Sequence, residues 1–517
     1  MDRLAFVDRH TASMTHPTAK AYLVGAGPGD PGLLTLRGRE LLGQADVVLY
    51  DYLANPRLLQ YARERAELVC LGRHGKGRFL DQAEIHRRMI EAVQAGRTVV
   101  RLKGGDPAIF GRVAEEIAAL EAAAIPYEVV PGVSAAQAAS SYAGIPLTHR
   151  DAASCVAFVT GRQCRDQEGT ALDMAGLARF PGTLVFYMGV TSAAEWAAEL
   201  IAGGKPADTP AAIVRYASLP QQQTLLTTLA ELPAVLAAGK VRPPAVAILG
   251  ETVRSKSQHD WFASRPLFGK TVLVTRPAHQ ADDMVEQLSR LGAAVLVQPA
   301  IEIQPPRDWT PVDDAIVQLA SFDWLVFSSA NGVRYFLERL QTRGLDMRAL
   351  GKARLAAIGP ATAEALAEYH LRADLQPDEY QAEALADSLR HRGPGKRLLL
   401  LRASRGREVL AEILVASGAE VCQAVVYESV DVTVPDPDVA TALADDRIDW
   451  VTVTSSAIAR SLATMFGESL QRAKLAAISP LTADVLTAAG LPVVAVASTY
   501  TTAGVLEAIL AAEAVGA

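Results

Sequence analysis

The stretch that decides the fold is V-V-R-L-K-G-G-D-P-A-I-F-G-R, residues 99–112. Its first residues are apolar and β-branched, which predicts a buried strand, and G-G-D-P then prevents any regular element from continuing. Beyond Ile109 the spacing of apolar residues predicts a helix. A strand that ends in two glycines and leads into a helix is where an α/β sheet lets a ligand approach the backbone. Taken alone, the stretch is better explained as an ordinary tight turn. A functional interpretation therefore depends on the other motifs of the first half.

The composition is that of an ordinary globular chain. With 517 residues, half of them apolar and 21% charged, the chain has the length of roughly three or four typical domains. Its net charge of -7, without any block rich in lysine or arginine, gives no support for a nucleic-acid partner or a membrane surface. No apolar run is long enough to span a bilayer, and we expect residues 1–19 to be a flexible tail.

The cysteines give a prediction about compartment and metal binding. Cys70, Cys155, Cys164 and Cys422 show no metal-ligand spacing. We therefore expect no metal site, and thiols in a reducing, cytoplasmic compartment.

Other strand ends in the first half resemble the opening stretch. V-G-A-G-P-G-D-P, which begins at Val24, lacks the third glycine of the dinucleotide fingerprint and contains Pro28. A-D-V-V-L-Y-D ends in Asp51, which either lies at the carboxyl edge of the sheet or caps the following turn. Y-E-V-V-P-G-V-S-A predicts a strand and then a helix that starts at Ser134, where an anion can bind. Because a new series of strands begins near residue 154, we predict two α/β lobes, about 20–131 and 150–262, with a cleft between them.

These motifs, together with Y-A-G-I-P-L-T-H-R-D and L-V-F-Y-M-G, occur in an order that resembles the uroporphyrinogen-III C-methyltransferases of the tetrapyrrole methylase class. The resemblance covers residues 20–262. It implies transfer of methyl groups from S-adenosylmethionine to C-2 and C-7 of uroporphyrinogen III, which gives precorrin-2. It also implies a homodimer formed through this half.

The same resemblance assigns roles to individual residues. Asp51 falls on the proton acceptor, and Arg112 falls where the tetrapyrrole is contacted. Arg73 replaces a family lysine that is assigned as a proton donor, and because arginine stays protonated, we expect it to contact a substrate carboxylate instead. The residues expected to bind the cofactor are Pro28, Gly104, Gly105, Asp106, Ile109, Ser134, Ala135, Met188 and Ala217. Positive charge for the carboxylates of the substrate is expected from Arg101, Lys103, Arg112 and Arg150.

The second half begins a new α/β series and contains a diverged repeat. Residues 254–266 are polar, and we place the linker between the halves at 263–269. D-W-L-V-F-S-S at 323–329 matches D-W-V-T-V-T-S at 449–455, and A-R-L-A-A-I-G-P-A-T matches A-K-L-A-A-I-S-P-L-T about 120 residues later. Such a repeat predicts a duplicated lobe.

Hydroxyl residues follow the strands of this repeat. The simplest interpretation is that they cap helices. Together with arginines after two other strands, they could also line one cleft for a flexible polycarboxylate. The candidate substrate-binding residues of this half are Arg276, Ser328, Ser329, Thr362, Arg402, Ser455 and Thr482.

This half resembles uroporphyrinogen-III synthase from about residue 266 onward, and R-P-L-F-G-K-T-V-L-V-T-R resembles the junction of methyltransferase–synthase fusions. The resemblance implies cyclisation of hydroxymethylbilane with inversion of ring D. It also implies two lobes joined by a double crossing, one at 270–300 and 430–517 and the other at 301–429. Tyr427 matches the tyrosine that assists loss of the substrate hydroxyl, although a tyrosine at a lobe crossing also has a purely structural explanation.

Two other functions remain open from the sequence. The first half could methylate RNA, as some relatives of the class do. The negative net charge of the chain and the tetrapyrrole-type motifs argue against this. The second half could be a non-catalytic tetrapyrrole-binding module, because it shows no Ser/His/Asp set or paired acids.

Overall fold

The computed structural model describes residues 19–72, 80–162, 172–379, 381–390, 392, 395–405 and 408–515. The chain divides into two compact units, one ending at Gly269 and the other beginning at Lys270, except that Leu291–Ala294 groups with the first unit. Within the described residues, no helix has the length and apolar character needed to cross a membrane.

The first lobe of the first unit is built on a five-stranded parallel sheet with the order β3-β2-β4-β1-β5. Its strands are β1 (Ala21–Gly25), β2 (Val47–Tyr50), β3 (Glu67–Cys70), β4 (Val99–Lys103) and β5 (Tyr127–Val130). Its helices are α1 (Leu36–Leu42), α2 (Gln82–Gln94) and α3 (Val113–Ala122).

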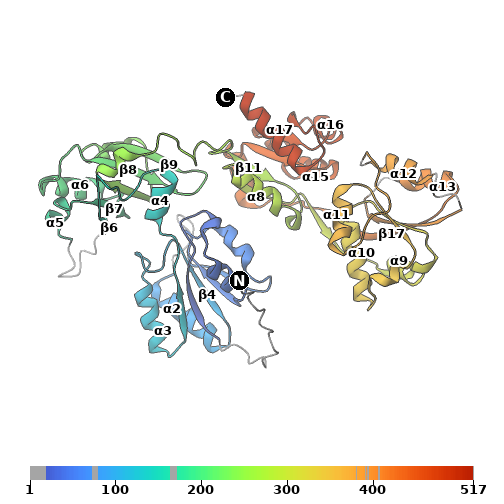
Figure 1. The fold of residues 1–517 in the computed structure, drawn as a ribbon, viewed down its shortest axis with the longest axis horizontal. Helices are drawn as coiled ribbons and strands as arrows, with labels where there is room; N and C mark the ends of the chain where they lie inside the picture. The colour runs from blue at the N-terminus through green and yellow to red at the C-terminus, as the bar shows by residue number, and fades with distance from the viewer. Residues whose placement is uncertain are drawn as a thin grey trace, which may run out of the picture. The chain divides into compact units, whose positions relative to one another are not determined.

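Successive side chains of these strands pack on opposite faces of the sheet. Leu23 belongs to the apolar cluster that includes residues of α2 and α3, while Val24 belongs to the cluster that includes residues of α1. Figure 1 shows α2 and α3 together on one side of β4. Because both faces are covered, the strands are continuous apolar runs in the sequence.

The helix after the opening stretch begins later than the sequence suggests. Apolar spacing predicts a helix beyond Ile109, but α3 starts at Val113. Phe110 and Arg112 have φ angles of 55° and 57°, and a right-handed helix does not allow these values. The residues between β4 and α3 therefore form a loop at the carboxyl edge of the sheet.

The second lobe holds a mixed sheet with the order β6-β7-β10-β8-β9, in which only β6 and β7 are parallel. Its strands are β6 (Val156–Thr160), β7 (Thr183–Tyr187), β8 (Pro210–Arg215), β9 (Gln223–Thr228) and β10 (Ala245–Leu249). Its helices are α4 (Ala135–Ala143), α5 (Met174–Ala178), α6 (Ala193–Ala202) and α7 (Leu232–Ala238). The edge strand β9 was not anticipated, because its threonines and glutamine give no clear apolar alternation.

The polar segment at 254–266 is packed on the first unit. The side chain of Phe262 is 2% exposed and contacts Tyr142 of α4 edge-on, at 4.7 Å between ring centroids. Trp261 Nε1 donates to the carbonyl oxygen of Ser141 at 2.9 Å. This segment therefore continues the first unit, and its two aromatic residues anchor it.

The second unit has two lobes, each with a five-stranded sheet, ordered β12-β11-β18-β19-β20 and β13-β17-β16-β14-β15. The strands of the first are β11 (Thr271–Val274), β12 (Ala294–Val297), β18 (Trp450–Val453), β19 (Lys474–Ala477) and β20 (Val493–Val496). Those of the second are β13 (Ile301–Gln304), β14 (Trp324–Phe327), β15 (Arg354–Ala357), β16 (Arg397–Ala403) and β17 (Glu420–Asp431). The helices are α8 (Asp282–Arg290), α9 (Thr310–Val317), α10 (Ala330–Thr342), α11 (Pro360–Glu368), α12 (Ala382–Arg390), α13 (Val409–Ala416), α14 (Pro437–Ala444), α15 (Ser456–Phe466), α16 (Pro480–Ala488) and α17 (Thr502–Val515).

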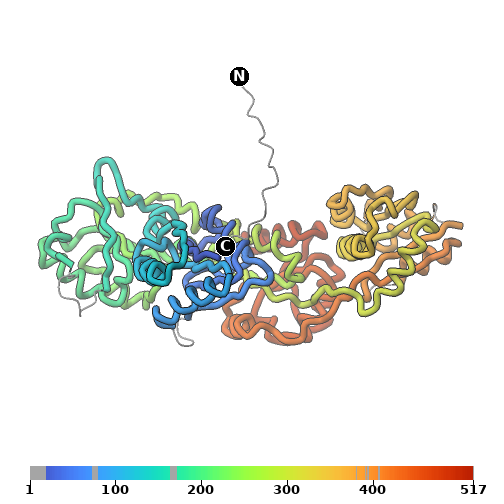
Figure 2. Tube along the Cα trace, turned by 90° about the horizontal axis from the view of Figure 1, so that it is seen from below, coloured from blue at the N-terminus to red at the C-terminus, as the bar shows by residue number. Residues whose placement is uncertain are grey.

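The chain passes between these lobes twice. It leaves the first lobe between β12 and β13, and it returns between β17 and α14. Figure 2 shows the two connecting segments in yellow-green and orange. The expected α/β fold, a two-lobed first half followed by a bilobal second half, is confirmed.

The repeat occupies equivalent places in these two lobes. β14 pairs in parallel with β15, and β18 pairs in parallel with β19. Ser329 Oγ accepts a hydrogen bond from Gly332 N in α10, and Ser455 Oγ accepts one from Ile458 N in α15. These two hydroxyls therefore do cap helices.

Candidate functional site

A cavity of about 580 Å³ lies in the first unit and is lined by residues of both lobes. Residues that are far apart in the sequence meet there, because the loops after β1, β2 and β4 and the start of α4 face the carboxyl ends of β7 and β8 and the start of β10. All nine residues expected to bind the cofactor line this cavity: Pro28, Gly104, Gly105, Asp106, Ile109, Ser134, Ala135, Met188 and Ala217.

Glycines let three loops pack closely beside the cavity. Gly105 N donates to Gly27 O at 2.8 Å, and Gly27 N donates to Gly105 O at 3.1 Å. A Cβ atom on Gly25 would lie 2.6 Å from backbone atoms of Gly132, and one on Gly132 would lie 2.3 Å from Gly105 O. Side chains at Gly25 and Gly132 would push the loops apart, which is the physical reason for glycine at the end of β1 and after β5.

Asp106 braces the same loops. Its Oδ2 accepts from Gly132 N at 2.9 Å, and its Oδ1 accepts from Ala108 N at 2.8 Å. Both carboxylate oxygens therefore bind backbone N–H groups of this loop and the next.

Ser134 directly precedes α4 and lies in the cavity wall. Its side chain is buried, and its Oγ lies 3.1 Å from the hydroxyl oxygen of Tyr187, which ends β7. The Tyr187 hydroxyl also accepts from Ala136 N in α4 at 3.0 Å. Burial raises the pKa of Tyr187, so its hydroxyl stays protonated.

Sequence reasoning missed several residues of the cavity wall. Four of them are sequence neighbours of expected residues, and Asn55 lies four positions after Asp51. Their position just after strands was the signal that could have identified them. The missed polar and aromatic members are Tyr52, Asn55, Phe110, Tyr187 and Tyr216.

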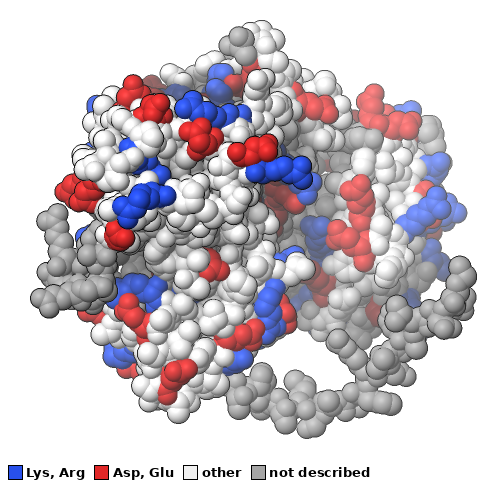
Figure 3. All heavy atoms as spheres, turned by 60° about the vertical axis from the view of Figure 1, so that its left-hand side comes forward, with Lys and Arg blue, Asp and Glu red and all other residues white. Residues whose placement is uncertain are grey.

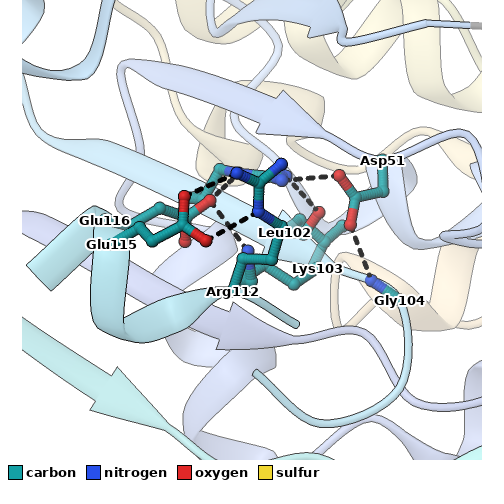
Figure 4. Close-up of polar contacts among 8 residues, drawn as sticks. Asp51, Leu102, Lys103, Gly104, Arg112, Glu115 and Glu116 are labelled. Atoms are coloured by element: carbon teal, nitrogen blue, oxygen red, sulfur yellow. Dashed lines mark hydrogen bonds and ion pairs between the residues drawn. The ribbon is translucent and has the colours of Figure 1, made fainter. Parts of the chain in front are cut away.

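Asp51 lies at the carboxyl edge of β2, and its carboxylate binds groups of β4 and of the loop after it (Figure 4). Oδ1 accepts from Arg101 Nη2 at 2.6 Å, and Oδ2 accepts from Gly104 N at 3.2 Å. The carboxylate therefore bonds to β4 and to the glycine loop that follows it, and neither bond is to the turn that follows β2. Its side chain is 31% exposed, so the group remains accessible.

Arg101, which bonds to Asp51, belongs to a group of buried charges that we call the Glu116 cluster: Arg101, Lys103 and Glu116. Figure 4 labels Lys103 and Glu116 of this cluster. Glu116 Oε1 accepts from Arg101 Nε at 3.0 Å and from Lys103 Nζ at 2.8 Å. Burial lowers the pKa of Lys103. The expectation that Arg101 and Lys103 offer charge to substrate carboxylates is wrong, because both side chains are about 3% exposed and are already paired.

Arg112 and Arg150, the other two expected cations, are exposed. Arg112 forms a two-point ion pair with Glu115, at 2.8 and 2.6 Å, and does not line the 580 Å³ cavity. Arg73 lies outside the described residues. On the face drawn in Figure 3, described lysine and arginine side chains are interspersed with aspartate and glutamate.

The second unit contains two adjoining cavities of about 720 and 630 Å³, and Tyr427 lines both. Arg276, Thr362 and Ser455 line the larger cavity, whereas Ser328 and Arg402 line the smaller one. Both lobes contribute to each cavity. The structure therefore brings these residues into one cleft.

Ser329 and Thr482 do not line either cavity. Ser329 Oγ lies 3.1 Å from the hydroxyl oxygen of Tyr427 and so sits behind it. Thr482 is buried, and its Oγ1 lies 3.1 Å from Ser479 Oγ. Sequence reasoning missed Gln280, Asn331, Arg405 and Tyr500, which line the larger cavity.

Tyr427 lies in β17 and is 7% exposed. Burial raises its pKa, while hydrogen bonds with Ser329 and Asn331 oppose that rise. The phenol is therefore protonated at neutral pH and can act as a proton donor. Within the described residues, no group of three or more His, Cys, Asp or Glu side chains is arranged to hold a metal ion.

Comparison with known proteins gives a match for each half. Residues 20–233 match the Tetrapyrrole (Corrin/Porphyrin) Methylases, and residues 282–507 match Uroporphyrinogen-III synthase HemD. The Porphyrin biosynthesis protein HemD of Ruminiclostridium josui is 34% identical over 435 residues, which cover 84% of this chain and 86% of that protein. The Uroporphyrinogen-III C-methyltransferase of Bacillus subtilis (strain 168) is 38% identical over 359 residues, which cover 69% of this chain and 73% of that protein.

Among solved structures, a uroporphyrin-III C-methyl transferase from Thermus thermophilus, complexed with S-adenyl homocysteine, is 44% identical. It covers 46% of this chain and 100% of its own, with a TM-score of 0.39. The two relatives above align across both halves, and each is covered over more than two thirds of its length. The chain belongs to the tetrapyrrole-biosynthesis family in which a tetrapyrrole methylase is followed by a uroporphyrinogen-III synthase.

Proposed function

We propose that the chain catalyses two successive reactions of tetrapyrrole synthesis. The second half cyclises hydroxymethylbilane to uroporphyrinogen III, and the first half methylates this product at C-2 and C-7 to give precorrin-2. The observation that carries the proposal is that all nine residues expected to bind S-adenosylmethionine line one cavity, although they come from both lobes.

The cavity suits S-adenosylmethionine in size and lining. Its volume of about 580 Å³ lies in the range of small-molecule sites, and its wall combines glycine backbone with the apolar side chains of Leu53, Ile109 and Met188. A Cβ on Gly105 would meet nothing closer than 3.9 Å, so the backbone there is open to a ligand. When bound, S-adenosylmethionine supplies an electrophilic methyl group.

Asp51 is the candidate base of the methylation. A pyrrole carbon that gains a methyl group must later lose a proton, and one accessible carboxylate near the macrocycle can accept it. Arg101 and the Gly104 N–H fix the carboxylate of Asp51 from behind, while about a third of its side chain remains exposed. Arg112 and, by resemblance, Arg73 would contact carboxylates of the substrate.

In the second half, Tyr427 is the candidate acid. Its protonated phenol lies where the two cavities adjoin, and it would assist loss of the substrate hydroxyl. The hydroxyls and arginines of both lobes would hold the acidic side chains of a flexible linear tetrapyrrole. Positioning of the two chain ends would then supply much of the rate.

Four further expectations stay predictions. They are the domain boundaries at 20–262 and 270–517, the homodimer through the first half, the cytoplasmic location, and the absence of a nucleic-acid partner.

The test is to incubate the purified chain with hydroxymethylbilane and S-adenosylmethionine and to identify the products. We expect precorrin-2, and uroporphyrinogen III when S-adenosylmethionine is omitted. Only the type I isomer from hydroxymethylbilane, with precorrin-2 formed from supplied uroporphyrinogen III, would mean that the second half is a binding module. Methyl transfer to ribosomal RNA but not to uroporphyrinogen III would favour the RNA methylase alternative.

A further inference from the structure

Three polar side chains form a hydrogen-bonded chain that crosses the cleft of the second unit toward Tyr427. Arg276 follows β11 in the first lobe, and Gln280 ends the short 3-10 helix that comes next. Asn331 lies in the first turn of α10, and Tyr427 lies in β17, both in the other lobe. All four line the 720 Å³ cavity.

The bonds run in sequence from one lobe to the other. Arg276 Nη2 donates to Gln280 Oε1 at 3.3 Å, and Gln280 Nε2 donates to Asn331 Oδ1 at 2.9 Å. Asn331 acts on the phenol of Tyr427 and lowers its pKa, while the phenol oxygen itself lies 3.1 Å from Ser329 Oγ. The bond between Gln280 and Asn331 is therefore a direct link between the lobes, next to the candidate acid.

The chemistry of the groups fixes the direction of these bonds. A guanidinium has only donors, so the amide of Gln280 must present its oxygen to Arg276 and its NH₂ group to Asn331. Asn331 uses its oxygen for that bond and has its NH₂ group left to donate to the phenol oxygen. If Asn331 presents this NH₂ group to the phenol, Tyr427 directs its O–H proton away from Asn331, toward Ser329 Oγ at 3.1 Å or toward a bound substrate.

Arg276 is placed to receive a substrate carboxylate. Its side chain is partly buried, and burial lowers its pKa, with Asp283 opposing the change. Among the residues that the structure describes, no carboxylate lies within ion-pair distance of its guanidinium, whereas Arg405 in the same cavity is paired with Asp431 at 2.6 Å. A desolvated cation that lacks a counter-charge favours an anionic ligand.

We propose that Gln280 and Asn331 are positioning residues that connect the binding of a substrate carboxylate at Arg276 to the proton-donating orientation of Tyr427. This inference rests on the synthase reaction proposed above. In that reaction the carbon–oxygen bond of the hydroxymethyl group breaks, and its electron pair and the Tyr427 proton leave with the oxygen as water. The proton released from the pyrrole carbon on ring closure returns to the phenolate.

Asn331→Asp tests the relay in the full chain. A carboxylate only accepts hydrogen bonds, so it would take the bond from Gln280 and also engage the phenol proton of Tyr427. We expect kcat for uroporphyrinogen III to fall by about tenfold or more with little change in KM, because positioning and proton donation both contribute to this step. The released intermediate would then close spontaneously, and the type I isomer would accumulate.

Gln280→Glu is the second variant. Its carboxylate keeps the contact with Arg276 but forces Asn331 to turn its NH₂ group toward residue 280 and its oxygen toward Tyr427. We expect the same loss of kcat and the same rise in type I isomer. Gln341→Glu is the matched control, because Gln341 is exposed at the far end of α10 and outside both cavities.

A double-mutant cycle separates positioning from a purely structural role. In a Tyr427→Phe background, Asn331→Asp should cause no further loss of kcat, because the proton that it misdirects is already absent. The inference would be wrong if the effects of Asn331→Asp and Tyr427→Phe on kcat were fully additive. It would also be wrong if both single relay variants kept the wild-type kcat and isomer ratio. If the wild-type chain itself forms only the type I isomer, the proposed synthase function fails instead. If Asn331→Asp does not fold, the same cycle is measured with Gln280→Glu and Tyr427→Phe.

Discussion

Arg101 Nη2 donates to Asp51 Oδ1 at 2.6 Å, and this bond joins a side chain that is 3% exposed to one that is 31% exposed. The Nε of the same guanidinium donates to the fully buried Glu116. Arg101 therefore holds the accessible carboxylate from the protein interior. A carboxylate fixed in this way needs little reorganisation to accept a proton at one place above the sheet edge.

Asp51→Asn should abolish most methyl transfer and keep cofactor binding. An amide cannot accept the proton that the methylated carbon must lose, and loss of a general base typically costs about 10²–10⁴-fold in rate. Turnover with uroporphyrinogen III and calorimetry with S-adenosylmethionine measure the two effects separately. Asp208→Asn is the control, since Asp208 is exposed and lies between α6 and β8, whereas Asp51 bonds to β4 and to the glycine loop after it. Equal turnover in both variants would leave Asp51 a structural role only.

Glu116→Gln should destabilise the first unit. It removes the anion between Arg101 and Lys103 and leaves two buried cations side by side. Breaking a buried ion pair by removal of one partner typically costs about 3–5 kcal/mol. Hydrogen exchange of the β4 amides in urea measures this change in the free energy of unfolding. The additional change Lys103→Met should recover part of the loss, and its failure to do so would contradict this account.

The lowered pKa of Glu513 predicts that the second unit loses stability in acid. Burial raises the pKa of Glu513, but hydrogen bonds from Lys474, Trp450 and Lys270 outweigh this and lower it from 4.5 to about 2. A lowered folded-state pKa gives stability that is present above pH 4.5 and is lost as the pH falls toward 2. Glu513→Gln should flatten this dependence in acid unfolding experiments. Glu507→Gln, on the exposed side of α17, should keep the wild-type slope.

Separation of the chain after Gly269 should give two pieces that each keep their chemistry. The first should make precorrin-2 from supplied uroporphyrinogen III, and the second should make uroporphyrinogen III without a cofactor. The cut must follow Phe262, because that ring is buried on the first unit. A cut before Trp261 should therefore lower the melting temperature of the first piece. Loss of both activities after the Gly269 cut would show that the halves depend on each other.

The sequence by itself determined the fold class and nine of the residues that line the 580 Å³ cavity. Apolar runs that end in glycine, such as residues 99–105, mark strands whose carboxyl ends meet at one sheet edge, and this arrangement depends only on local spacing. The cavity residues Gly104, Met188 and Ala217 could be named from motifs because each lies where a strand ends. The duplicated lobes of the second half were equally visible, because a repeat is a property of the sequence.

The tertiary structure alone decided which charges are buried and which groups act in pairs. Arg101 and Lys103 follow the alternation of a strand, but only the packing of α3 shows that Glu116 neutralises both inside the protein. The bond between Gln280 and Asn331 joins residues 51 positions apart. Such pairs depend on how separate elements pack against each other, because a buried charge or amide is stable only where the fold brings it a partner, and local sequence spacing does not contain that information.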